Sequence, residues 1–231
     1  MTSHNDTASR IARPWNLVTA LLSTAALIIQ LILVIRGVGV LTDENGPTVA
    51  APERVLRFFS YFTVQSNILV ILSCLTLVLA PQRDGRIWRV LRLDAIVGIT
   101  VTIIVYHFAL APLLDLKGLA SLTDITFHYV TPVLAIAGWL LFGPRPRIDR
   151  ATLLWSLAWP ALYFVYSLIR GAITNWYPYP FVDVTTIGYP RAFVNLLIVC
   201  VLLLGVGVLY RFGDAKLRPI PVDRKKLPAQ P

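Results

Sequence analysis

Six apolar segments, each roughly 18–25 residues long, constrain this chain more than any other feature of its sequence. About 20 residues of helix cross the hydrocarbon core of a bilayer, where every backbone N–H and C=O must be satisfied internally. Only 14% of the 231 residues are charged, against about 25% in soluble domains. We therefore predict an all-α, polytopic membrane bundle of six transmembrane helices, near residues 15–36, 56–80, 93–114, 125–142, 152–171 and 191–212.

The segments outside these helices are short. We expect an N-terminal tail over 1–14, a six-helix domain over 15–212 and a basic C-terminal tail over 213–231. The first apolar segment is too long for the h-region of a signal peptide and no small-residue cleavage site follows it, so it should remain as a membrane anchor. Cys74 and Cys200 both lie in apolar runs, which disfavours a disulfide or a metal site built from them.

The basic residues predict the orientation. If the N-terminus is cytoplasmic, 15 of the 21 Lys and Arg residues lie on the cytoplasmic side, as the positive-inside rule requires. Both termini are then cytoplasmic, and the protein is expected to be a multi-pass protein of the cell (plasma) membrane. The acidic residues divide evenly, so the inner side carries the net charge of +9. This excess is a topology signal, and a nucleic-acid partner is not expected.

Strongly polar side chains recur at one depth of the predicted bundle. At about 1.5 Å per residue, each helix contributes at least one of them to a layer roughly 5–15 Å below the outer surface. Buried polar groups without partners are costly in lipid, so these side chains should face protein or a wet cavity. The layer comprises Gln30, Thr63, Asn67, His107, His128, Tyr166, Arg170 and Asn195.

Thr63 and His128 are the residues of this layer best suited to catalysis. A neutral imidazole is a common base for activating a hydroxyl nucleophile, and ionisable residues inside a span are usually functional. Asp124 shares a helical face with His128 and could orient its ring, as could Thr131. The alternatives are a Thr63 hydroxyl bonded to its own helix, and an Asp124 that only complements the helix dipole.

The other polar residues have supporting or binding interpretations. Asn67 could donate to a developing oxyanion or join two helices. His107 could hydrogen-bond within the bundle, assist His128, or bind a haem or metal together with it. Substrate-binding roles are expected for Gln30, Tyr166, Arg170 and Asn195, although an arginine at a helix end often extends toward the interface instead.

Three short motifs resemble those of a known family: YFTVQSNIL (61–69), FHYVTPVLAI (127–136) and WYPYPFVD (176–183). With them, the chain resembles the bacterial six-helix membrane proteins related to the androgen-induced FAR-type family of eukaryotes. Eukaryotic members are threonine hydrolases that cleave fatty-acid esters of hydroxy fatty acids. The resemblance implies that Thr63 is the nucleophile and His128 the base.

The leading hypothesis is therefore a threonine-type lipid-ester hydrolase, with a membrane lipid or fatty-acid ester as its partner and no cofactor or metal. The first alternative is a haem or metal protein that uses His107 and His128. A transporter, or a membrane protein whose polar layer only joins helices, is the other alternative.

Overall fold

The computed structural model describes residues 2–38 and 49–217, and most of this part is helical. It contains no strand, and six of its helical segments are long and apolar enough to cross a membrane: Ile11–Ile35, Phe62–Leu79, Arg86–Leu113, Gly118–Phe142, Arg150–Thr174 and Val184–Lys216. The prediction of an all-α bundle with six membrane-spanning helices is confirmed.

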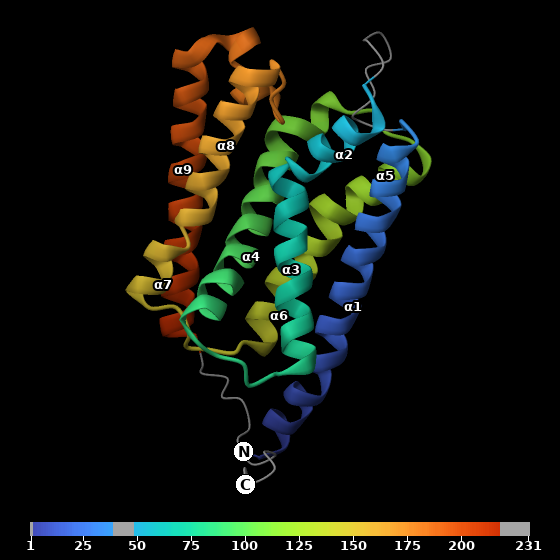
Figure 1. Cartoon of the computed structure of the whole chain (residues 1–231). Helices are drawn as coiled ribbons and strands as arrows, with labels where there is room; N and C mark the ends of the chain where they lie inside the picture. The colour runs from blue at the N-terminus through green and yellow to red at the C-terminus, as the bar shows by residue number, and fades with distance from the viewer. Residues whose placement is uncertain (1, 39–48, 218–231) are drawn as a thin grey trace, which may run out of the picture.

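Figure 1 shows the order of the elements along the chain. The long helices are α1 (Thr2–Ile35), α3 (Phe62–Leu79), α4 (Arg86–Val105), α6 (Thr131–Phe142), α8 (Ala158–Thr174) and α9 (Val184–Lys216). The shorter helices are α2 (Ala51–Phe59), α5 (Gly118–Ile125) and α7 (Arg150–Trp155). The remaining elements are the π-helical turns η1 (Tyr106–Leu110) and η3 (Thr126–Val130) and the 3-10 turns η2 (Ala111–Leu113) and η4 (Pro180–Val182).

Residues at both predicted tails are helical. Residues 2–14 form the first turns of α1, and residues 213–216 extend α9, so both helices run beyond their apolar parts. The rest of the predicted C-terminal tail, 218–231, lies outside the described residues. We call the end of the bundle where α1 begins and α9 ends the terminal end. The opposite end, which carries α2, α5 and residues 175–183, is the distal end (Figure 1).

Helices α1, α3, α4 and α6 pack against one another, and α8 and α9 cover one side of this group (Figure 1). Small side chains such as Ala20, Ala95 and Ala135 lie where α1, α3, α4 and α6 meet. Larger aromatic side chains fill the space between α8–α9 and the rest. Phe62 of α3 stacks on Trp159 of α8 with ring centroids 4.6 Å apart. These bulky side chains separate α8 from α3, and a cavity lies beside them.

The predicted helix over 56–80 is two helices, because the chain breaks at Ser60 and Tyr61. Tyr61 is extended, with φ −77° and ψ 131°, and α3 starts directly after it. A helix start inside the bundle leaves backbone groups without partners. Side chains satisfy two of them: the Tyr163 hydroxyl donates to the Ser60 carbonyl at 3.1 Å, and the Thr63 N–H donates to the Tyr179 hydroxyl at 3.2 Å.

Two π-helical turns also follow from the sequence. In η1 and η3 the N–H groups of Ala111 and Thr131 donate five residues back, to the carbonyls of Tyr106 and Thr126. A proline is the second residue after each turn, at positions 112 and 132. Proline has no N–H and its ring clashes with the carbonyl four residues earlier, so the helix widens there. Single π turns are frequent at functional sites.

Proline affects α8 as well. A proline in the middle of a spanning helix is expected to kink it, and Trp159-Pro160 lies in the middle of the fifth predicted span. The structure instead ends α7 at Trp155 and starts α8 at Ala158, so Pro160 lies in the first turn of α8. Proline is well tolerated in a first turn, where its missing N–H would have no helical partner.

Candidate functional site

A mostly apolar cavity lies between α8–α9 and the α3–α4 pair, toward the distal end. Its volume is about 40 Å³, measured as the space open to the centre of a water-sized group. The polar lining residues are Thr63, Thr102, Tyr106, Tyr163, Ser167 and Tyr179. The apolar ones include Val105, Phe164, Leu168 and Val199, which are only partly buried. The cavity is therefore walled by side chains that also reach the outer surface of the bundle.

Thr63 is a buried cavity residue in the first turn of α3. Several hydroxyls in this protein donate to the carbonyl four residues back in their own helix, among them those of Thr19, Ser23, Ser60, Thr100 and Thr126. The Thr63 hydroxyl differs, because its hydrogen-bond partner is the Tyr179 hydroxyl, with the two oxygens 3.4 Å apart. The structural alternative for Thr63, a bond to its own helix, does not describe this geometry.

Tyr179 reaches Thr63 from the segment between α8 and α9. This segment turns at Asn175, which has a left-handed φ of 53°, and the ring of Tyr177 packs directly on Gly171. The Asn195 side chain donates to the Phe181 carbonyl at 2.8 Å, and the Phe181 ring stacks on Tyr179. Burial raises the pKa of the Tyr179 phenol, so it stays neutral and keeps its O–H as a donor.

His128 is buried in the π turn η3, and Asp124 fixes its ring. The His128 Nδ1 lies 2.9 Å from the Asp124 carbonyl oxygen and 3.0 Å from the Asp124 carboxylate. Both groups are acceptors, so Nδ1 carries a proton, and in the neutral imidazole Nε2 is then the nitrogen with the free lone pair. Thr131, the other candidate for orienting the ring, pairs with Ser23 instead, at 2.8 Å.

Tyr106 connects His128 to the cavity. Its ring lines the cavity and stacks on the His128 imidazole, with centroids 3.7 Å apart and planes 12° apart. Its hydroxyl donates to the Asp124 carboxylate, which also accepts from His128. Tyr106, Asp124 and His128 thus form one hydrogen-bonded and stacked group on neighbouring π and α turns.

Asn67 hydrogen-bonds to both α3, which carries Thr63, and η3, which carries His128. It is fully buried one turn below Thr63, and its side-chain amide donates to the Thr63 carbonyl at 2.9 Å and to the Phe127 carbonyl at 3.4 Å. Its own carbonyl oxygen has no hydrogen-bond partner among the described residues. Asn67 therefore holds α3 beside η3. The hydroxyl of Thr63 and the imidazole of His128 make no direct hydrogen bond, since Thr63 pairs with Tyr179 and His128 with Asp124.

Thr63 is the one member of the predicted polar layer that lines this cavity, and four other members have partners elsewhere. Gln30 accepts a hydrogen bond from Thr123, and the Tyr166 hydroxyl lies 2.6 Å from that of Ser60. Arg170 forms an ion pair with Glu53 at 2.8 Å and lies over the Trp176 ring. Asn195 supports residues 175–183, as described above. These contacts join helices and loops at the distal end.

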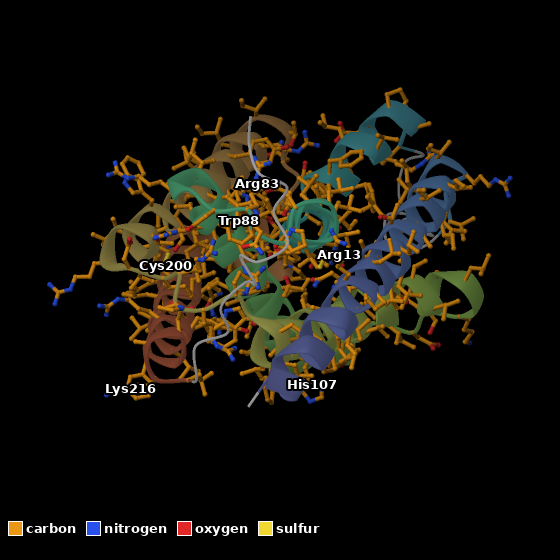
Figure 2. All side chains as sticks on the ribbon, turned by 90° about the horizontal axis from the view of Figure 1, so that it is seen from below. Arg13, Arg83, Trp88, His107, Cys200 and Lys216 are labelled. Atoms are coloured by element: carbon orange, nitrogen blue, oxygen red, sulfur yellow. The ribbon has the colours of Figure 1, made fainter. Side chains whose placement is uncertain are left out.

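His107 and His128 lie in different surroundings and have different partners. His107 is exposed at the margin of the bundle (Figure 2), and its Nδ1 lies 3.1 Å from the Tyr129 hydroxyl. His128 is buried and turned toward Asp124. Across the described residues there is also no group of three or more His, Cys, Asp or Glu side chains arranged to hold a metal ion.

Tyr106 and Tyr179 are absent from the site residues that the sequence predicts. The motif WYPYPFVD contains Tyr179, but its register against Thr63 depends on a tertiary contact across 116 residues. Tyr106 carries no motif of its own, although it neighbours His107. Thr102 and Ser167 also line the cavity, and both hydroxyls are buried without a hydrogen-bond partner among the described residues.

Comparisons with known protein families, with curated proteins and with solved structures found no match for this chain. The geometry of the cavity and the three sequence motifs are therefore the features that point to a function.

Proposed function

We propose that this integral membrane protein hydrolyses lipid esters, with Thr63 as the nucleophile and His128 as the general base. The observation that carries the proposal is the environment of Thr63. Its hydroxyl is buried, lines an apolar cavity and pairs with a tyrosine hydroxyl instead of a carbonyl of its own helix. A merely structural threonine in a membrane helix has no need of such a cavity or of such a partner.

The start of α3 favours negative charge beside Thr63. The first N–H groups of a helix have no helical partners and carry the positive end of its dipole. The N–H of Thr63 is one of these groups, and it donates to the Tyr179 hydroxyl. This N–H and the Tyr179 O–H would donate to the oxyanion that forms when the Thr63 oxygen adds to the acyl carbonyl.

His128 is prepared for proton transfer by Asp124. With Nδ1 bonded to Asp124, the free Nε2 would accept the Thr63 proton as the oxygen attacks, and return it to the leaving alcohol. Water would then add to the Thr63 acyl ester and lose a proton to His128. His128 would return this proton to the Thr63 oxygen as the bond to the acyl carbon breaks, which releases the fatty acid and restores both side chains. The Tyr106 ring stacks on His128 and lines the cavity, so a shift of this ring or one bridging water would complete the proton path.

The walls of the cavity suit an acyl chain. Most lining side chains are aliphatic or aromatic, and several are partly exposed on the surface that would face lipid. An ester dissolved in the bilayer would reach Thr63 sideways, without crossing water. We further propose that both termini are cytoplasmic and that the protein lies in the cell membrane, which puts the cavity near the outer leaflet.

Hydrolysis of para-nitrophenyl esters of medium- and long-chain fatty acids by the purified protein in detergent tests the proposal. Thr63→Ala should abolish turnover, and His128→Ala should lower it by about a hundredfold or more, because general-base catalysis is lost. Thr19→Ala is the matched control, since Thr19 is a buried threonine bonded to its own helix at 2.9 Å.

The control variant should keep the wild-type rate. Turnover that survives in a folded Thr63→Ala protein would contradict the proposed mechanism.

A further inference from the structure

At the terminal end of the bundle, an arginine is buried between helices. Arg92 lies on α4, six residues after the helix begins at Arg86, which corresponds to about 9 Å along the axis. Only 7% of its surface is exposed. Burying a guanidinium is costly unless its charge and its N–H groups are satisfied.

Only some of the N–H groups of the Arg92 guanidinium have hydrogen-bond partners among the described residues. One terminal nitrogen donates to the Gly143 carbonyl, and the group lies over the Trp88 ring, 5.3 Å from its centroid. The other terminal nitrogen, Nη1, is buried and has no hydrogen-bond partner among the described residues. Among the described residues no carboxylate forms an ion pair with Arg92. The Asp214 carboxylate is near enough to attract its charge, and Arg145 and Arg147 are near enough to repel it.

Arg92 lines a second cavity, formed by α1, α3, α4 and α6. The centre of a water-sized group can move through about 20 Å³ of it, which is room for a small polar group. Its polar lining residues are Asn16, Ser73, Cys74 and Arg92. Asn16 and Ser73 are only partly buried, so they mark the side from which the cavity is reached.

We propose that this second cavity binds a phosphate oxygen of a phospholipid headgroup, with Arg92 as its principal ligand. Phosphate is an acceptor only, and an arginine with free N–H groups is the side chain that recognises it best. Arg92 has an unpartnered Nη1 and no direct ion pair among the described residues, and both observations favour an anionic acceptor. This site is separate from the Thr63 cavity and does not depend on the proposed hydrolysis.

The surroundings favour a lipid as the source of the phosphate. Arg13 is exposed on α1 one turn before Asn16, and Figure 2, which looks at this end, labels it together with Arg83 and Trp88. Leu17 and Leu21, which follow on α1, are 40% and 58% exposed and form an apolar surface for acyl chains. A lipid whose headgroup lies at the cavity could therefore pack its acyl chains against this apolar surface of α1.

Native mass spectrometry of the purified, delipidated protein in detergent tests the site. The probes are dioleoyl phosphatidic acid, dioleoylglycerol, which lacks only the phosphate, and inorganic phosphate. The wild-type protein should bind one equivalent of phosphatidic acid saturably and should not retain dioleoylglycerol. Arg92→Gln should weaken phosphatidic acid binding about tenfold or more, as expected for loss of a hydrogen bond from a charged group.

Arg86→Gln is the matched control, because Arg86 is exposed on the same helix and at the same end. It should leave the binding of phosphatidic acid within about twofold of wild type, since an exposed charge contributes little. If Arg92→Gln does not fold, Ser73→Leu fills the cavity while keeping the arginine, and it should abolish saturable binding.

Equal binding of phosphatidic acid by the wild type and by Arg92→Gln or Ser73→Leu would overturn the proposal that the lipid binds in this cavity. Equal retention of dioleoylglycerol would show that the phosphate is not recognised. If inorganic phosphate at the same concentration as the lipid displaced phosphatidic acid, the site would bind free phosphate, and the proposal of a lipid headgroup would be overturned.

Discussion

At the scale of single residues, Thr63 differs from threonines such as Thr19 and Thr100 in the hydrogen-bond partner of its hydroxyl. Thr19 and Thr100 donate to carbonyls of their own helices, at 2.9 and 2.6 Å, and Thr100 also pairs with the Tyr210 hydroxyl at 2.8 Å. The Thr63 hydroxyl pairs with Tyr179 beside a cavity. Burial keeps Tyr179 neutral, so this pair offers a nucleophile and an acid within one contact.

Tyr179→Phe tests the oxyanion role of the phenol. The ring remains to pack against Phe181, but the donor beside Thr63 is lost. We expect kcat for ester hydrolysis to fall by about 10²–10³, the usual effect of removing one oxyanion donor, with little change in KM.

Tyr210→Phe provides the comparison, since the buried Tyr210 hydroxyl pairs with Thr100 and does not line the Thr63 cavity. It should leave kcat unchanged. Equal rates for Tyr179→Phe and wild type would remove Tyr179 from the mechanism.

At the scale of elements, interruptions of helices position the site. The break at Ser60–Tyr61 puts Thr63 in a first helical turn, and the π turns η1 and η3 carry Tyr106 and His128. Apolar length predicted the six spans, because crossing a bilayer demands about 20 apolar residues. It could not predict the break before α3, since Leu56–Ala80 contains no glycine or proline and the break depends on Tyr163 and Tyr179 from distant segments.

The sequence predicted some residues of the candidate site and missed others, as it did for the helices. A shared depth and an intramembrane histidine pointed to Thr63, His128, Asn67 and Asp124, all of which take part in the described network. Depth along a helix says nothing about rotation around it. For that reason Gln30, Tyr166 and Arg170 have partners outside the cavity, and the tyrosines that line it are not among the predicted site residues.

The segment that carries Tyr179 depends on a glycine in α8. A Cβ added at Gly171 would lie 2.0 Å from the Tyr177 ring, so Gly171→Ala must displace residues near 175–183. We expect the variant to lose about 1–3 kcal/mol of stability, as overpacked sites do, and to hydrolyse esters more slowly as Tyr179 shifts. Thermal unfolding and ester hydrolysis measure the two effects.

Gly205→Ala is the control, because no atom lies within 4 Å of a Cβ placed there. It should match or slightly exceed wild-type stability, since alanine is the better helix former. A Gly171→Ala protein with wild-type stability and activity would contradict the packing argument.

At the scale of the whole molecule, basic residues gather at the terminal end and the proposed catalytic cavity lies toward the distal end. We expect the terminal end to face the cytoplasm, because Lys and Arg are retained there during insertion. Single cysteines at exposed positions test this in a chain whose own Cys74 and Cys200 are replaced by serine. In intact cells a membrane-impermeant maleimide should label Asp115→Cys, at the distal end, and should label Arg150→Cys only after lysis.

The reverse pattern of labelling would invert the topology. The Thr63 cavity would then open toward the inner leaflet, and the buried Arg92 toward the outer one.

The central claim is that Thr63 is an activated nucleophile, and labelling with a fluorophosphonate probe tests it most directly. The detergent-solubilised protein is treated with the probe and the adduct is mapped by mass spectrometry, beside Thr63→Ala and His128→Ala. We predict an adduct on Thr63 in the wild type that is absent from both variants. A folded wild-type protein without an adduct on Thr63, or labelling of Thr63 that persists in His128→Ala, would contradict the proposed mechanism.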